Sequence, residues 1–287
     1  YSDQDIAVIH WLKTQVDNGM AISQAVAWLE QITDKAGGRG LAVLPGFTEE
    51  VATPTANAIA QRTRVRSFEV LQTELMDALL HYDEQRADEA ISEAFALYTV
   101  EEVGEQIFVP VLVEIGELWH QGEVSITKEH YATNYIMQRL MSLVRATGHN
   151  QNAPIIWVGC APGELHEIGA LLLSLYMRRA GYQVHYLGRN LPIDDFVAEV
   201  RRKEPRMLLL SAGSREAASG LRQLTELLAQ LESPRPVVGY GGRIFNEAPE
   251  LRTEIAGVYL GASAEEAVEM VNGLLQHSPS KANTQFR

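Results

Sequence analysis

The second half of the sequence alternates short apolar runs with helical segments, and this alternation limits the folds that the chain can adopt. Five runs stand out: PIIWVGC, QVHYLG, MLLLSAG, PVVGYGG and GVYLGA. Segments of helical periodicity separate them, and a last one ends near Leu275. Strands that alternate with helices pair in parallel, because each connection crosses a face of the sheet. Residues 153–276 are therefore predicted to form a flavodoxin-like, Rossmann-type domain with a five-stranded parallel sheet.

A helical region precedes this predicted domain. Between residues 64 and 147, apolar side chains recur every three or four residues, as at Phe68, Leu71 and Leu75. That spacing is typical of amphipathic helices that bury one face. Four such stretches with short joints predict a four-helix bundle over residues 64–147.

Three further segments complete the expected organisation. Residues 1–32 have the pattern of two short helices. Residues 33–63 are rich in Gly, Pro, Thr and Ala, which predicts a linker. Residues 277–287, HSPSKANTQFR, predict a disordered tail.

Composition excludes several classes of protein. With 46% hydrophobic residues the chain is not disordered as a whole, and no apolar run approaches the about 18 residues of a membrane span. The acidic start does not resemble a secretory signal, so we expect a cytoplasmic protein without membrane contact. Cys160 is the single cysteine, which excludes an internal disulfide and a multi-cysteine zinc site. A net charge of −13 argues against a broad nucleic-acid-binding face.

The residues that could bind a ligand or a metal lie just after the predicted strands. Ligands of doubly wound sheets bind at the carboxyl ends of the strands. There, His166 lies in a loop before a helix, and imidazole is a good ligand for a transition metal. Glu164 is placed to accept a hydrogen bond from the other ring nitrogen, and Gly169 leaves room for a large planar group. The later strand ends contribute Leu187, Gly188, Ser211, Gly241 and Gly242.

Plainer interpretations of these residues stay open. His166 alone is also compatible with a residue that only caps a helix, and Gly241-Gly242 with a tight turn. The sequence carries no dinucleotide fingerprint, Walker sequence or hydrolytic motif, so we expect a binding protein and not an enzyme.

A second cluster falls in the helical region. Trp119 and His120 end its third helix, and Glu129 and His130 begin its fourth. We expect these four side chains to meet at one corner of the bundle. The alternatives are a core anchor for Trp119 and a solvated helix end for His120.

The motifs together resemble those of a known domain. Glu164-x-His166-x-x-Gly169, with the glycine and serine positions at the later strand ends, resembles the cobalamin-binding domain, where aspartate is usual in place of Glu164. The resemblance implies that His166 is the lower axial ligand of cobalt. It also implies that the displaced nucleotide tail runs into the sheet past Ser211 and the glycines.

The helical region resembles one branch of these proteins. Trp119, nine residues and Glu129-His130 are similar to the W-x9-E-H motif of CarH/LitR-type adenosylcobalamin photoreceptors, which are MerR-family transcriptional repressors. Residues 1–32 resemble the rear half of a MerR winged-helix domain. The DNA-reading helix-turn-helix of that family does not appear in this sequence, so we expect this chain alone to bind DNA weakly.

This resemblance implies roles for the bundle residues and for assembly. Adenosylcobalamin would be the chromophore, with Trp119 over the adenosyl group, Glu129 in contact with it and His130 in the same motif. His120 matches the histidine that takes the upper cobalt position after light has removed the adenosyl group. The family further implies a homo-oligomer, a tetramer in the dark, that holds operator DNA and releases it in light.

Two other functions stay open on the sequence. A corrinoid protein that carries methyl groups for a methyltransferase system shares the bundle and the sheet but does not need Trp119-His120. A light-independent sensor of cobalamin or another tetrapyrrole is the second alternative, because histidine also binds haem iron.

Overall fold

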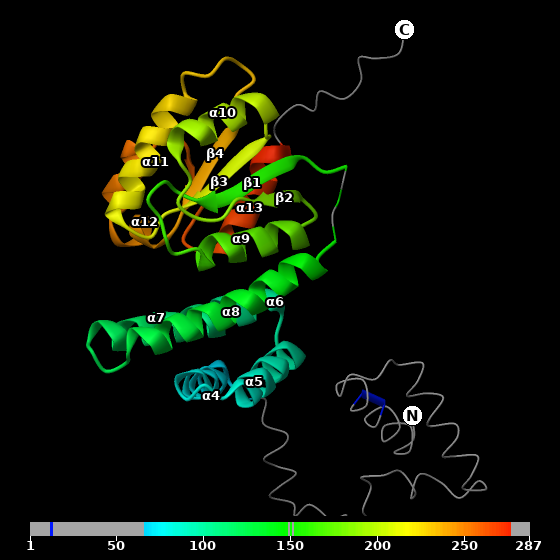
Figure 1. Cartoon of the computed structure of the whole chain (residues 1–287). Helices are drawn as coiled ribbons and strands as arrows, with labels where there is room; N and C mark the ends of the chain where they lie inside the picture. The colour runs from blue at the N-terminus through cyan, green and yellow to red at the C-terminus, as the bar shows by residue number, and fades with distance from the viewer. Residues whose placement is uncertain (1–11, 14–65, 149, 151, 277–287) are drawn as a thin grey trace, which may run out of the picture. The chain divides into compact units, whose positions relative to one another are not determined.

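The structure is a computed structural model, and it divides into two units, residues 1–65 and residues 66–287. The residues it describes are 12–13, 66–148, 150 and 152–276. In the first unit only Leu12 and Lys13 are described, both helical. The predicted MerR-like segment and linker therefore lie almost wholly outside the described residues, and so does the predicted tail (Figure 1).

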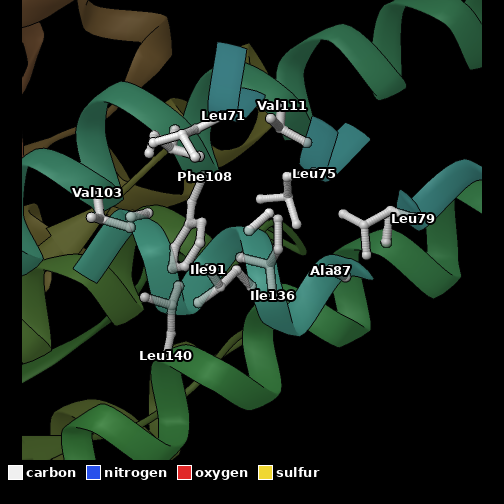
Figure 2. Packing of buried hydrophobic residues seen from close by; sticks show 14 of the residues in the cluster. Leu71, Leu75, Leu79, Ala87, Ile91, Val103, Phe108, Val111, Ile136 and Leu140 are labelled. Carbon is white, nitrogen blue, oxygen red and sulfur yellow. The ribbon is translucent and has the colours of Figure 1, made fainter. Parts of the chain in front are cut away.

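The first part of the second unit is helical, as predicted. Its elements are α4 (Phe68–Leu80), α5 (Glu84–Leu97), α6 (Val100–Val103), the π-helix η1 (Gly104–Phe108), α7 (Val109–His120) and α8 (Ile126–Ala146). Local signals begin two of these helices: the Asp83 carboxylate accepts a hydrogen bond from the Arg86 backbone N–H, and Thr99 forms a reciprocal capping box with Glu102. The apolar faces meet in one core, in which Leu71, Phe108 and Ile136 point toward one another (Figure 2).

The third helix of the bundle changes its winding along its length. α6 runs without a break into the π-helix and then into α7. Pro110 is the second residue of α7, directly after the π-helix, and a proline offers no N–H to the helix at this change of winding. At Gly104 a side chain would meet the Tyr176 hydroxyl oxygen at 2.2 Å, so only glycine lets the wide turn pack this closely on its neighbour.

The second part of the unit is the predicted parallel sheet. The strands are β1 (Ile155–Cys160), β2 (Gln183–Tyr186), β3 (Met207–Ser211), β4 (Val237–Gly241) and β5 (Val258–Tyr259), in the order β2-β1-β3-β4-β5. Every strand pair is parallel. The connecting elements are α9 (Ile168–Arg179), α10 (Ile193–Lys203), α11 (Arg215–Leu228), α12 (Arg243–Glu247), the 3-10 helix η2 (Pro249–Glu254) and α13 (Ala264–Gln276). This strand order is the flavodoxin-like one and confirms the predicted fold class.

Helix α9 joins the two parts, because it belongs to two cores at once. Its residues Leu171, Leu172, Leu175 and Tyr176 pack with the helical bundle, whereas Leu173 and Met177 pack with the sheet and α13. Figure 1 shows α9 between α8 and the strands. A helix that is apolar all round is buried on all sides. Even so, neither α9 nor any other helix in the described part of the chain is long and apolar enough to cross a membrane.

Candidate cofactor site

The loop between β1 and α9 holds a buried carboxylate that organises its neighbours. Glu164 is 2% exposed. Its Oε1 accepts hydrogen bonds from the backbone N–H of Leu165 at 2.9 Å and of His166 at 2.8 Å. Its Oε2 accepts the backbone N–H of Gly213, just beyond β3. The loop after β1 is thus fastened to the carboxyl end of the neighbouring strand.

The same carboxylate orients the His166 ring. The imidazole Nδ1 lies 2.7 Å from Glu164 Oε1. A carboxylate accepts hydrogen bonds only, so Nδ1 carries the proton and Nε2 carries the lone pair. The His166 side chain is 84% exposed, while its partner is buried. Nε2 is therefore free to bind a ligand or a metal at the carboxyl edge of the sheet.

The pKa values of Glu164 and His166 shift in the directions expected for a carboxylate that accepts a hydrogen bond from an imidazole. Burial on its own would raise the pKa of Glu164, but the hydrogen bonds from the His166 ring and from the backbone of His166 and Gly213 lower it to about 2. The hydrogen bond to Glu164 raises the pKa of His166, and partial burial opposes this. Two further charges act on that pKa: Arg243 lowers it, and Glu129 of α8 raises it.

The other strand ends form an accessible floor beside this loop. Gly169 is exposed in the first turn of α9, and a Cβ there would lie 3.3 Å from the Ser211 hydroxyl oxygen, so these two positions are neighbours. Gly241 ends β4, Gly242 follows it, and both are half-buried. Gly242 has φ +114°, and a Cβ there would lie 2.3 Å from the carbonyl oxygen of Ala212, so this turn requires glycine.

Leu187 and Gly188 directly follow β2, and their surroundings differ. Gly188 has φ +79°, and no atom lies within 4 Å of the position a Cβ would take, so its backbone faces open space. Leu187 instead packs against the core between the sheet and α10. There it lines an apolar groove of about 500 Å³ together with Trp157 and Phe196. The structure therefore does not bring Leu187 to His166.

The two residue pairs predicted to meet at a corner of the bundle flank the turn between α7 and α8, and their side chains are largely exposed. Trp119 and His120 end α7, and Glu129 lies in the first turn of α8. Trp119 is 44% exposed, and His120 and His130 are exposed. Glu129 accepts a hydrogen bond from Thr133 and lies in contact with His130 Nδ1. No hydrogen bond or ion pair among the described residues joins this pair to Trp119 or His120.

Trp119 continues an apolar face of α7 that points away from the bundle core. Val113 lies on that face and is 49% exposed. Gly116 lies between the two, and no atom comes within 4 Å of the position its Cβ would take. On the facing domain, Leu165 is 57% exposed beside His166. Large apolar side chains are thus exposed both on α7 and beside His166.

The donor set restricts what kind of metal this edge could hold. Within the described ranges, no three His, Cys, Asp or Glu side chains gather where they could hold an ion. His166 can offer a single nitrogen. That set fits a metal whose remaining ligands come from a large organic ring, and the exposed apolar side chains of Leu165 and Trp119 fit the ring itself.

Comparisons with known proteins agree with this chemistry. Residues 154–271 match the model of a B12 binding domain, and residues 71–144 match that of a second one. The α/β part and the helical bundle of this chain are thus each similar to a B12 binding domain. These matches support cobalamin as the class of cofactor.

Individual relatives of the B12-binding domains fall into two groups. The HTH-type transcriptional repressor CarH of Myxococcus xanthus is 29% identical over 240 residues, which cover 83% of this chain and 74% of the repressor. Dimethylamine corrinoid protein 3 of Methanosarcina acetivorans is 26% identical over 165 residues, 57% of this chain and 78% of that protein. The monomethylamine corrinoid protein of Methanosarcina barkeri shares the fold, with a TM-score of 0.60, 18% identity, and coverage of 72% of this chain and all of that one.

Three residues near the loop between β1 and α9 were not predicted from the sequence. Tyr186, Glu167 and Arg189 contact one another or the loop on either side of His166. A tyrosine at a strand end or an arginine in a loop is common in any sheet, so no local pattern singled them out. Only the parallel pairing of β1 with β2 brings them together.

Proposed function

We propose that this chain is the cofactor-binding part of a cobalamin-dependent transcription regulator that senses light through adenosylcobalamin. The observation that carries the proposal is His166, whose Nδ1 is held by Glu164 and whose Nε2 is exposed. The similarity to the repressor CarH, which extends over the bundle and the sheet, supports the regulatory role.

The residues of the chain divide into two sides of one site. His166 would be the lower axial ligand, and the backbone at Ser211, Gly241 and Gly242 would contact the nucleotide tail. On the other side, Trp119, Glu129 and His130 would contact the upper ligand. When bound, adenosylcobalamin would supply a cobalt–carbon bond that visible light breaks.

The open corner of the bundle suits a response to light. Trp119 and His120 are exposed and lack polar partners among the described residues, so their surroundings can change at little cost to the bundle core. His120 is next to Trp119 and offers an imidazole nitrogen as a replacement ligand. A change of packing at this corner would alter contacts between copies, which we expect to form a tetramer in the dark. Binding of operator DNA would follow from that assembly, through a DNA-reading domain that does not appear in this sequence.

The experiment is an absorption spectrum and size-exclusion chromatography of the protein loaded with adenosylcobalamin, in the dark and after green light. We expect a bound corrinoid, an irreversible spectral change and a smaller assembly after illumination. His166→Ala should abolish tight binding, because it removes the only proposed protein ligand to cobalt in the dark. The exposed His185→Ala is the matched control and should bind as the wild type does. A His166→Ala protein with unchanged affinity and spectrum would refute the site.

A methyl-carrying corrinoid protein is the second candidate. The similarity to dimethylamine corrinoid proteins and the fold shared with the monomethylamine corrinoid protein favour it. This function predicts a bound corrinoid, no change of assembly in light, and methyl transfer in the presence of a partner methyltransferase. His120→Ala separates the two, because it would leave methyl transfer unchanged but alter the spectrum of the illuminated regulator.

A further inference from the structure

The last residue of β2 and the segment after it contact the ligand loop on both sides of His166. The backbone N–H of Asn190 donates to the carbonyl oxygen of Glu164 at 3.1 Å. The Tyr186 hydroxyl donates to Glu167 Oε2 at 2.8 Å. His166 therefore lies between two contacts with one neighbouring segment.

The contact on the far side of His166 is made by a well-packed carboxylate. The Glu167 side chain is 13% exposed, and Glu167 is also the residue from which α9 begins. Its carbonyl oxygen accepts the Leu171 N–H at 2.9 Å, in the first turn of α9. Arg189 Nε approaches Glu167 Oε1 at 3.8 Å, but Arg189 is largely exposed, so this ion pair is weak. Tyr186 is thus the firmest side-chain partner of Glu167.

β2 is an edge strand, and β1 is its neighbour in the sheet. The register pairs Tyr186 with Val158, two residues before the end of β1. The backbone N–H of Cys160, the last residue of β1, also donates to the carbonyl oxygen of Gly188 at 2.9 Å. The end of β2 therefore lies beside the ligand loop. A displacement of Tyr186 would also displace Glu167, which it contacts.

We infer that Tyr186 is a positioning residue, which acts through Glu167 to hold the His166 imidazole in the direction needed to bind cobalt. Glu164 sets the tautomer of the ring from one side. Tyr186 and Glu167 hold the backbone from which the ring projects on the other side. A metal bond to nitrogen is directional, and loss of a contact that orients a ligand weakens metal binding about 10–100-fold. The inference rests on the proposed binding of a corrinoid by His166.

The test is Tyr186→Phe, which removes one hydroxyl and keeps the ring. Tyr182→Phe is the matched control, because Tyr182 precedes the same strand at its other end and donates its hydroxyl to Asn272. Both proteins are loaded with cobalamin and reduced to the cobalt(II) form. The proteins carry 15N-labelled histidine, so that splitting by the axial nitrogen of His166 differs from splitting by the nitrogen of cobalamin's own nucleotide base. The readout is the His166 splitting of the electron paramagnetic resonance signal, together with the affinity for cobalamin.

We expect Tyr186→Phe to bind cobalamin about 10-fold more weakly and to lose a large part of the nitrogen splitting. Tyr182→Phe should keep both. Glu167→Gln still offers an oxygen to Tyr186 and should retain most of the splitting, whereas Glu167→Ala should behave as Tyr186→Phe does. If Tyr186→Phe does not fold, the comparison of Glu167→Gln with Glu167→Ala tests the same role.

The wild type separates the two ways in which the experiment can fail. A wild type that binds no cobalamin, or binds it without nitrogen splitting, refutes the proposed function itself. A wild type with nitrogen splitting, beside Tyr186→Phe and Glu167→Ala proteins with the same splitting and affinity, refutes the positioning role and leaves the proposed function intact.

Discussion

The two histidine clusters of this protein differ in how completely the fold holds them. At the loop after β1, Glu164 is buried and accepts hydrogen bonds from the backbone of Leu165, His166 and Gly213 as well as from the imidazole. At the α7–α8 corner, Trp119, His120 and His130 are exposed. One cluster is built before any ligand arrives, whereas the other has few partners of its own.

The difference indicates a division of labour. A prearranged imidazole binds its metal without first being ordered, so the ligand loop suits a permanent contact. An open corner has no packing of its own to lose and gains contacts when a ligand covers it. Such a corner suits the changeable side of a site. If this comparison holds, the ligand loop should respond to substitution as a rigid cluster, and the corner of the bundle should respond as an open one.

The largest effect is expected at the buried carboxylate. Glu164→Ala leaves backbone donors of the ligand loop without a partner in a buried place. We expect the free energy of unfolding to fall by about 3 kcal/mol, because an unsatisfied buried donor costs about 1–3 kcal/mol and more than one donor loses its partner. Urea unfolding followed by circular dichroism measures it. Glu129→Ala at the open corner is the control, with an expected change below about 1 kcal/mol. Equal losses in the two variants would contradict the comparison.

Acid should weaken the same loop by nearly as much. The pKa of Glu164 is lowered from 4.5 to about 2, chiefly by hydrogen bonds that outweigh burial. A carboxyl with a lowered pKa contributes stability above its unfolded pKa and loses it as the pH falls from 4.5 toward 2. For this buried group the difference amounts to about 3 kcal/mol. His166 is protonated throughout that range and does not add to the slope.

Comparison with Glu164→Gln isolates this effect, since glutamine does not titrate. The stability advantage of the wild type over Glu164→Gln, measured by urea unfolding at several pH values, should shrink between pH 4.5 and 2. A constant difference over that range would mean that the loop does not hold a charged carboxylate.

The helix that ends at the open corner makes a close packing contact at its other end. At Gly104 a Cβ would lie 2.2 Å from the Tyr176 hydroxyl oxygen and 2.9 Å from Leu172 Cδ2, and both neighbours are buried. Gly104→Ala should therefore lower the unfolding free energy by about 1–3 kcal/mol through overpacking. Gly116→Ala in α7 is the matched control, because nothing lies within 4 Å of its Cβ position. It should gain up to about 1 kcal/mol from helix propensity. Thermal unfolding distinguishes the two signs.

The sequence predicted the well-built cluster better than the open one. The strand alternation, the parallel sheet and the Glu164–His166 contact all follow from local patterns: apolar runs of strand length, and a two-residue spacing that lets one side chain reach the other. The corner pairs Trp119-His120 and Glu129-His130 could also be placed, since they flank one short turn. The sequence carried no sign, however, that these four side chains would stay exposed.

What escaped prediction depends on contacts between distant segments. The π-helix begins at Gly104, which packs closely against Tyr176 of α9, a residue distant in the sequence. The hydrogen bond from Tyr186 to Glu167 requires that β2 lies beside β1. The direction of Leu187, into the core under α10, depends on which face of the strand end that helix covers. Periodicity reports which residues are buried, but not which partner buries them.

The smallest effect on stability, and the sharpest test of the open corner, is expected at Trp119. Because the ring is 44% exposed, Trp119→Ala should change the free energy of unfolding without ligand by no more than about 0.5 kcal/mol. If Trp119 covers the adenosyl group, the variant should bind adenosylcobalamin about 10-fold more weakly, the loss of one aromatic contact, and hydroxocobalamin as the wild type does. Isothermal titration with both corrinoids measures the two affinities. Equal weakening for both would mean that Trp119 contacts the corrin ring or supports the bundle, and a loss of stability would mean that the corner is already packed without ligand.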